Sequence, residues 1–201
     1  EGRAIPTRAE LLSAGEHINI NDLIIDAERN AVRFADPELL LDVGAIAKGY
    51  TAEKCAELLT SMGVTSYVLD FGGNLRIVGK KPDGGSWRTG VKNPDVLSDT
   101  SYVYYLDVSD TSVVTSGDYQ RFYIVDGKSY HHIINKDTLF PAEYYSSVSV
   151  ICENSGLADA LSTALFNMEM ADAVALLDTL DGVSVVWVYP DGEVETYGLE
   201  Q

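Results

Sequence analysis

The sequence predicts a single domain of the α+β class, with a mainly antiparallel sheet and packed helices. Strand-like segments outnumber helical ones, and short hairpin-type turns join most of them. Such links favour antiparallel pairing, because parallel strands need a long crossover connection. A length of 201 residues allows one substantial hydrophobic core, and no internal repeat or low-complexity linker divides the chain. We therefore expect residues 1–201 to form one domain.

The N-terminal part is expected to form a short helix followed by short strands. Pro6 in a first-turn position and the pair Leu11–Leu12 indicate a helix that ends at Gly15. Alternating apolar residues then predict strands, and Asn30 marks a hairpin turn between the last two. These strands are expected at 17–20, 23–25 and 31–34.

The stretch 40–62 is expected to run from a strand end through a small-residue turn into a helix. Its apolar run ends on Asp42, Gly44 lies in the turn, and the helix begins near Ile46. Gly63 follows at the position of a helix C-cap glycine. The residues spaced as on one buried helix face are Ala52, Cys55, Leu59 and Met62.

This unit has two interpretations that spacing alone does not separate. A turn followed by a helix start exposes backbone N–H groups and a positive dipole end, which suit an anionic ligand. The same pattern also describes an ordinary link in which Asp42 starts a helix. Other parts of the chain have to decide between them.

The rest of the chain is expected to be rich in strands, with two helices before a final hairpin. Residues 67–70 and 75–78 form strands that Phe71–Asn74 interrupts, and Asp126–Gly127 is a strong two-residue hairpin signal. Further strands are expected at 103–108, 112–115, 121–125, 130–134, 147–151, 183–189 and 193–197. The two helices, both rich in alanine and leucine, are expected at 157–167 and 170–180.

The charge balance argues against nucleic acid as a partner and limits how a phosphate could bind. A net charge of −17 and a pI near 4.3 argue against a basic nucleic-acid-binding face. The same charge repels free phosphates, so a phosphate site is expected to need a metal cation or a helix terminus. With 46% hydrophobic and 22% charged residues, the chain has the composition of a globular protein.

Neither a transmembrane segment nor a disulfide framework is expected. The apolar runs fall short of the roughly 18–20 residues that a membrane helix needs, and residues 1–3 show no signal-peptide pattern. Cys55 and Cys152 lie in apolar patterns and are expected to be small core residues. They leave the compartment open.

Two glycine-containing segments are candidates for ligand contact. Gly72–Gly73–Asn74 lets the backbone approach a ligand, but a strand follows and no GxGxxG is present, which disfavours a Rossmann dinucleotide site. A β-bulge or turn is the alternative. Thr115–Tyr119 places four hydrogen-bonding side chains around a glycine, either as a polar turn or as a ligand-contacting loop.

His131 and His132 are candidates for acid–base chemistry. Neighbouring strand residues face opposite sides, so only one of the two can face a given site; His132 would share a face with Tyr130 and Ile134. A neutral histidine is the usual base for a hydroxyl. A structural histidine is the alternative.

Asp159 and Thr163 are candidates for metal binding. They lie four positions apart in a predicted helix, so their oxygen atoms share one face. One charged and one neutral oxygen ligand suit a magnesium ion that water, a carbonyl and phosphate oxygens complete. The alternative is an exposed aspartate beside a threonine that bonds back to its own helix.

Five segments, taken in order, resemble those of the FAD:protein FMN transferases, the ApbE-type flavin transferase family. They are DVGAIAKGY at 42–50, FGGN at 71–74, TSGDY at 115–119, HHIIN at 131–135 and ADALSTAL at 158–165. The resemblance implies a T-fold-like flavin transferase core. It also implies an Mg²⁺-dependent enzyme that cleaves FAD, attaches FMN by a phosphoester bond to a threonine or serine of an acceptor protein, and releases AMP.

The same resemblance implies roles for individual residues. His132 would deprotonate the acceptor hydroxyl. The implied magnesium ligands are the side chains of Asp159 and Thr163 and the backbone carbonyl of Ala45. The positions that contact or shape the FAD site are Asp42, Lys48, Gly72, Gly73, Asn74 and Ile134.

The sequence departs from the family pattern in three ways. Asn135, Lys136 and Leu139 stand where family sequences usually carry Asp, Pro and Gly, so this loop is expected to position the base or the acceptor differently. Residues 1–201 also lack the upstream segment that covers the flavin ring and the usual lipoprotein or signal segment. We therefore expect a truncated or shortened relative. The resemblance implies that its full-length form is extracytoplasmic, periplasmic or cell-surface, and membrane-associated as a lipoprotein.

Two other functions fit the same residues. One is a non-catalytic FAD-binding or scaffold protein descended from this family, which predicts no AMP release. The other is an Mg²⁺-dependent FAD pyrophosphatase, in which water replaces the acceptor hydroxyl and the products are FMN and AMP. AMP release without any acceptor would separate the pyrophosphatase from the transferase.

Overall fold

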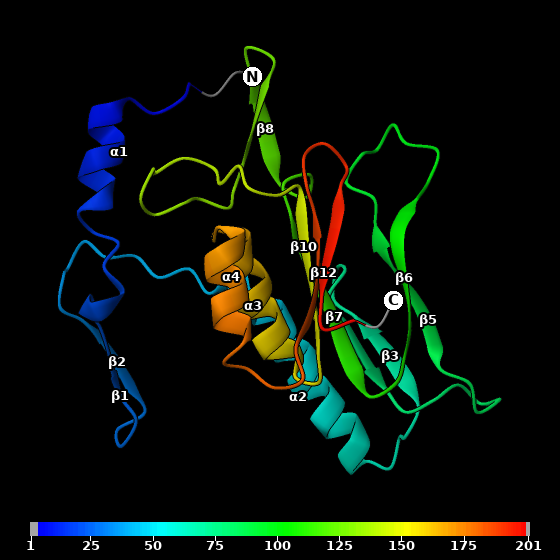
Figure 1. Ribbon diagram of the computed structural model, residues 1–201. Coiled ribbons are helices and arrows are strands. Elements are labelled where there is room, and N and C mark those ends of the chain that lie inside the picture. Colours follow the sequence, from blue (N-terminus) through cyan, green and yellow to red (C-terminus); the bar gives the residue numbers. More distant parts are fainter. Residues whose placement is uncertain (1–3, 200–201) are drawn as a thin grey trace.

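The computed structural model describes residues 4–199, so residues 1–3, in which no signal-peptide pattern is expected, lie outside the described residues. A six-stranded antiparallel sheet forms the centre of the molecule (Figure 1). Its strands, in spatial order, are β12 (Val194–Tyr197), β11 (Ser184–Val188), β10 (Ser147–Cys152), β7 (Thr111–Gly117), β4 (Leu75–Val78) and β3 (Tyr67–Asp70). All neighbouring strands pair antiparallel, which confirms the predicted α+β class.

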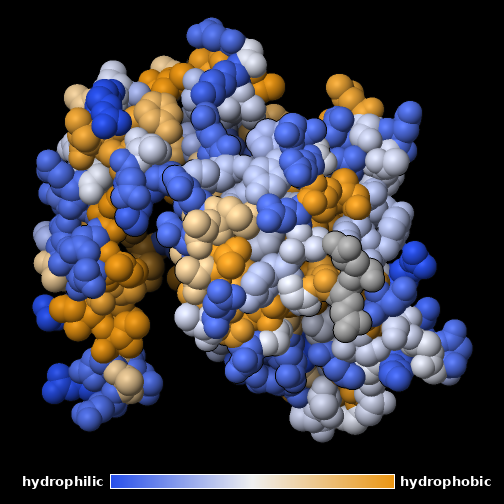
Figure 2. Space-filling view, viewed as in Figure 1, coloured by the Kyte–Doolittle hydropathy of each residue, from blue (hydrophilic) through white to orange (hydrophobic). Residues whose placement is uncertain are grey.

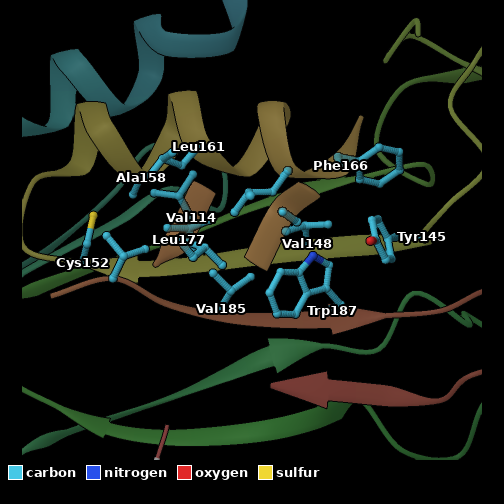
Figure 3. Close-up of a cluster of buried hydrophobic side chains, with 14 of the residues drawn as sticks. Val114, Tyr145, Val148, Cys152, Ala158, Leu161, Phe166, Leu177, Val185 and Trp187 are labelled. Carbon is cyan, nitrogen blue, oxygen red and sulfur yellow. The ribbon is translucent and has the colours of Figure 1, made fainter. Parts of the chain in front are cut away.

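Helices cover one face of this sheet, and the last two of them form the main core with it. They are α2 (Gly44–Ser61), α3 (Ser155–Phe166) and α4 (Met170–Leu177). Figure 3 shows side chains of α3 and α4 meeting those of β10 and β11 in a cluster of buried residues. Trp187 and Phe166 are the largest fully buried side chains of this cluster. This packing fixes α3 on the sheet.

A hairpin covers part of the opposite face of the sheet. It consists of β5 (Trp87–Lys92) and β6 (Tyr102–Val108), and its Val91 and Leu106 pack against Val113 of β7 in a second core. Strand neighbours alternate between faces, so Val113 belongs to this second core and Val114 to the main one. Strand β10 is buried along its whole length, because its side chains point alternately into these two cores.

The N-terminal arm lies beside this body (Figure 1). It comprises α1 (Arg8–Gly15), the 3-10 helix η1 (Ile20–Asp22), β1 (Leu23–Asp26) and β2 (Ala31–Phe34). A capping box between Thr7 and Glu10 starts α1. Ile20, Ile25 and Val32 are 67%, 71% and 56% exposed, and Figure 2 shows hydrophobic surface along the arm. The arm therefore adds little to the core.

Turn residues behave as the sequence predicts. A hairpin of β8 (Phe122–Val125) and β9 (Lys128–His131) follows β7, and Asp126 and Gly127 take positive φ values of 49° and 78°, as in a type I′ turn. Gly63 has φ +87° at the end of α2, and the N–H of Val64 donates to Leu59 O at 3.1 Å, which confirms a C-cap glycine.

Two predicted strand segments before α2 are wrong. Residues 17–20 form a turn that leads into η1, because the side chain of Asn19 accepts the N–H of Asn21 and starts the 3-10 helix. The run before Asp42 is not a strand either. The Asp42 carboxylate accepts the N–H of Gly44 at 2.7 Å, and α2 begins at Gly44 rather than near Ile46.

The predicted strand at 130–134 begins and ends too late, since β9 spans Lys128–His131. There the N–H of Ile133 donates to Nδ1 of His131 at 3.3 Å, which turns the backbone out of the ladder. The buried face of α2 also differs from the prediction. Ala52 is buried, but Met62 is 69% exposed, and the other buried positions are Gly49 and Ala56.

The cysteines are free, as expected. Cys152 is buried in the main core, whereas Cys55 on α2 is half-buried. No helix within residues 4–199 is long and apolar enough to span a lipid bilayer.

Candidate functional site

A cavity of 310 Å³ lies where the start of α2, the end of β7 and the middle of α3 approach the segment that follows β9. The predicted site residues that line it are Asp42, Ala45, Lys48, His132, Ile134, Asp159 and Thr163. The remaining ones, Gly72, Gly73 and Asn74, lie on the far side of Lys48. Three elements distant in sequence therefore bring the predicted residues into one region.

Asp159 is held in the cavity wall by a close contact between α2 and α3. Its side chain is 3% exposed, its Oδ2 accepts the backbone N–H of Gly49 at 2.8 Å, and its Oδ1 lies 3.4 Å from Nζ of Lys48. A Cβ on residue 49 would lie 2.6 Å from Cβ of Asp159. Only glycine at position 49 therefore allows the helices to approach this closely.

The backbone carbonyl of Ala45 lies one helical turn before this contact. In a regular α-helix the N–H of Gly49 is directed at the carbonyl four residues earlier, which is that of Ala45. Here the same N–H lies 2.8 Å from Oδ2 of Asp159. A carbonyl oxygen has two lone pairs, so that of Ala45 has accepting capacity for another ligand, at a position that lines the cavity.

The hydroxyl of Thr163 belongs to a chain of hydroxyl groups with one consistent direction. Ser162 donates to the carbonyl of Asp159 at 3.0 Å, so Ser116 must donate to Ser162, at 2.8 Å. Ser116 has only one proton, so Thr163 must donate to Ser116, at 3.1 Å. The lone pairs of Thr163 Oγ1 remain for a ligand in the cavity.

These oxygen atoms fit a hard cation such as magnesium. A buried carboxylate, a hydroxyl whose proton is already used and a backbone carbonyl are ligands of the type that Mg²⁺ prefers. Across residues 4–199, no three His, Cys, Asp or Glu side chains gather in an arrangement that could hold a metal. A cation at Asp159 would therefore complete its shell with neutral protein oxygens, water and ligand oxygens.

The two histidines have different environments, although β9 ends at His131 and strand alternation does not extend to His132. His131 is 9% exposed; its Nε2 lies 2.9 Å from the carbonyl of Ala142, and its ring meets Phe166 edge-on at 5.6 Å. A carbonyl can only accept, so Nε2 of His131 carries the proton, while Nδ1 accepts the N–H of Ile133. His131 is therefore a structural residue.

His132 has the opposite arrangement of its ring nitrogens. Nδ1 lies 3.1 Å from the carbonyl of Arg121, so it carries the proton and the lone pair of the neutral ring is on Nε2. Partial burial lowers the pKa of His132, because desolvation disfavours the charged imidazolium. Both effects suit a general base that accepts a proton at Nε2.

The FGGN segment forms a turn between β3 and β4 and contacts Lys48. Gly72 and Gly73 have φ values of +66° and +94°, the left-handed region that favours glycine. Asn74 is 1% exposed, and its Oδ1 accepts Nζ of Lys48 at 3.1 Å, while its Nδ2 has no hydrogen-bond partner within the described residues. Lys48 thus stands between Asn74 and Asp159.

A larger cavity of 1040 Å³ adjoins the first one, and sequence reasoning missed most of its charged residues. The FGGN turn, the β5–β6 hairpin and the end of β7 enclose it. Its charged lining comprises Lys48, Arg88, Lys92, Arg121 and Asp70. This excess of cations, in a chain of net charge −17, creates a local attraction for anions. No sequence motif marks this group, because its cations come from three segments distant in sequence: α2, β5 and the residues after β7.

Other site features were also missed or misplaced from the sequence. Thr115, Ser116 and Gly117 do not form a polar turn but end strand β7, where Ser116 reaches Thr163. The role of Gly49 had no signal beyond its place in DVGAIAKGY at 42–50.

Comparisons with known proteins agree with this arrangement. A family model described as the ApbE family matches residues 1–187. A relative named FAD:protein FMN transferase from Treponema pallidum is 38% identical over 174 residues, which cover 82% of this chain and 48% of the relative. One of the same name from Vibrio cholerae is 33% identical over 185 residues, or 90% of this chain and 54% of the relative. The chain therefore spans about half the length of the curated relatives it matches.

Solved structures give the same result. The ApbE protein of Thermotoga maritima superimposes with a TM-score of 0.88 and 32% identity over 97% of this chain and 63% of that chain. The flavin transferase ApbE of Vibrio cholerae gives a TM-score of 0.81 and 29% identity over 98% of this chain and 62% of that chain. On the strength of the family model, the identity to these relatives and the shared fold, this chain belongs to the ApbE family.

Proposed function

We propose that this chain acts as an Mg²⁺-dependent FAD:protein FMN transferase, which cleaves FAD, links FMN to a threonine or serine of an acceptor protein and releases AMP. The observation that carries the proposal is the 310 Å³ cavity, whose wall holds His132, Lys48, Asp159 and Thr163. A base, a cation and hard oxygen ligands are the groups that phosphoryl transfer requires. The names of the relatives support the same reaction.

FAD is proposed to lie across the two adjoining cavities. Lys48 and Arg121 line both of them, so a pyrophosphate placed at their junction would meet two positive side chains. The cations and tyrosines of the 1040 Å³ cavity suit the anionic and aromatic parts of the AMP half. The local positive charge offsets the repulsion that the rest of the chain exerts on phosphates.

His132 is proposed as the base. Nε2 would take the proton of the acceptor hydroxyl, whose oxygen then bonds to the phosphorus of the FMN half. The bond between this phosphorus and the bridging oxygen breaks, and AMP leaves with its electron pair. Lys48 and Arg121 would stabilise the negative charge on the phosphoryl oxygens during this exchange.

Asp159, Thr163 and the Ala45 carbonyl would hold Mg²⁺, which when bound neutralises charge on the pyrophosphate oxygens. Lys48 now lies 3.4 Å from Oδ1 of Asp159 and 3.1 Å from Oδ1 of Asn74. It can therefore give up the carboxylate and keep the amide contact while it turns toward a phosphate. Asn74 is proposed to steady Lys48 during this change.

Intact-protein mass spectrometry tests the proposal. The chain is incubated with FAD, Mg²⁺ and an acceptor protein, and the expected result is a mass gain of one FMN on the acceptor. An acceptor whose target threonine is replaced by alanine is the matched control and should gain nothing. AMP release without an acceptor would instead indicate a pyrophosphatase, and FAD binding with neither product would indicate a non-catalytic flavin-binding protein.

A further inference from the structure

A third cavity lies on the other side of His132 and is mainly apolar. It measures 540 Å³ and lies between the N-terminal arm, the β8–β9 hairpin and the segment 132–141, which Figure 1 shows close to one another. Its apolar lining includes Leu11, Ile18, Tyr123, Leu139 and Phe140. His132 and Ile134 line both this cavity and the 310 Å³ cavity, so the two adjoin at the proposed base.

Leu139 forms part of the apolar wall in a conformation that leucine disfavours. Its φ is +61°, a left-handed value that costs an L-residue with a Cβ roughly 1–2 kcal/mol. Strained residues of this kind persist where the surroundings fix them, and they gather at ligand-binding and active sites. A substitution by glycine would remove the strain but also the apolar side chain. A leucine in this strained position is therefore consistent with a use for its side chain.

Hydrogen bonds and packing hold Leu139 in this conformation. Its N–H donates to the carbonyl of Asn135 at 2.8 Å, and the Oδ1 of Asn135 accepts the N–H groups of Asp137 and Thr138 at 2.9 and 3.2 Å. A Cβ on Gly15 would lie 3.0 Å from Cδ1 of Leu139, so the leucine packs against the end of α1. The loop and the arm thus form one preorganised wall.

The geometry of phosphoryl transfer decides which substrate uses this wall. The attacking and leaving oxygens lie roughly in line on opposite sides of the phosphorus. The cationic 1040 Å³ cavity suits the leaving AMP, and it does not include His132. The attacking hydroxyl must reach His132, which lines the apolar cavity. An acceptor polypeptide would therefore approach from the side of the apolar cavity.

We propose that the 540 Å³ cavity is an acceptor subsite that takes an apolar side chain next to the target threonine or serine, and that Leu139 determines this preference. The inference rests on the proposed transferase function and deepens it. Its occupant is a polypeptide segment with an aliphatic or aromatic residue beside the target hydroxyl. An apolar side chain in such a pocket gains affinity from the area that it removes from water.

Equilibrium binding of two peptides in the presence of FAD, with Mg²⁺ removed by a chelator, tests this subsite. The peptides differ only in the residue next to the threonine, which is leucine in one and serine in the other. The leucine peptide is expected to bind about tenfold more tightly, the size of effect that a small apolar group has in a pocket. Binding requires no transfer, so the test stands apart from the transferase assay.

The Leu139→Asn variant tests whether the preference for the leucine peptide depends on this wall. Asparagine tolerates the left-handed conformation, so the loop keeps its backbone while the wall becomes polar. The preference for leucine should disappear in Leu139→Asn and persist in the control Leu97→Asn, since Leu97 is 91% exposed and lies outside all three cavities. Circular dichroism shows whether both variants keep their fold.

The outcomes separate the two proposals. Equal affinity for both peptides, or a preference that survives in Leu139→Asn, overturns the acceptor subsite. A loss of FAD affinity in Leu139→Asn with unchanged peptide affinity also overturns it, because the cavity would then hold the flavin ring. A preference that depends on Leu139 without any FMN transfer supports the subsite and counts against the transferase function.

Discussion

The backbone N–H of Gly49 and the Oδ2 of Asp159 lie 2.8 Å apart, and this contact joins helix α2 to the candidate metal site. One helical turn further along α2, Glu53 accepts the N–H of Ser155 at 2.7 Å. Residues 49 and 53 thus face residues 159 and 155, with the same spacing of four on both helices. The register between α2 and α3 is fixed at two points, and it sets how Ala45 and Lys48 face Asp159.

Replacing Gly49 by alanine should damage both stability and the site. The added Cβ would lie 2.6 Å from Cβ of Asp159 and even closer to the Ser155 carbonyl, so the helices must separate. Overpacking of this kind costs about 1–3 kcal/mol in the free energy of unfolding, which urea denaturation measures. Gly156→Ala is the control, because its Cβ would first meet the Asn154 side chain, at 3.2 Å. Equal stability of Gly49→Ala and the wild type would contradict this account.

Removing the cation that pairs with Glu53 should loosen the start of α3. Arg76 donates from Nε to Glu53 at 3.1 Å, with side-chain exposures of 10% and 13%. Breaking a buried pair from one side costs about 3–5 kcal/mol, because the remaining charge is left without a partner. We expect a loss of this order in Arg76→Met. In Lys54→Ala, which breaks the exposed pair with Glu57, the loss should stay below about 1 kcal/mol. Similar losses in both variants would rule out this role for Arg76.

Asp159→Asn should abolish transfer by weakening the metal site. The amide keeps an oxygen for the N–H of Gly49 but loses the charge that a cation needs. FMN transfer is expected to fall by about a hundredfold or more, the scale seen when one key electrostatic group is removed. The Mg²⁺-dependent rise in melting temperature should disappear as well. Asp172→Asn, a change on α4, is the control and should retain both properties.

The pH dependence of transfer should follow His132. The base acts in its neutral form, and burial lowers the pKa of His132 by disfavouring the imidazolium. The single-turnover rate should therefore rise with pH through a midpoint below that of free histidine, about 6.5, and be level near neutrality. His132→Gln should remove this transition and reduce the rate by about 10²–10⁴-fold. A midpoint above that of free histidine would mean that His132 is not the base.

Local patterns predicted the fold class and most elements, because hairpin signals such as Asp126–Gly127 and the helix stop at Gly63 act over a few residues. They failed where side chains compete with the backbone. Asn19 and Asp42 accept nearby N–H groups and replace expected strands by turns, and the ring of His131 ends β9 early.

The candidate site was predictable only in part. Asp159 and Thr163 share a helix face, and helical spacing shows this directly. The hydroxyl chain through Ser116 joins β7 to α3, and the cations of the 1040 Å³ cavity come from α2, β5 and the segment after β7. Such contacts between segments distant in sequence leave no periodic signal. The strained Leu139 was visible only as an unusual residue in its loop until its φ value and its contact with α1 were known.

The stoichiometry of AMP release tests the central claim most directly. The chain is incubated with FAD, Mg²⁺ and an acceptor protein, and AMP and FMN-modified acceptor are quantified in the same samples. The account predicts one AMP for each FMN attached to a threonine or serine, and neither product from Asp159→Asn. AMP that accumulates together with free FMN, while the acceptor remains unmodified, would contradict it.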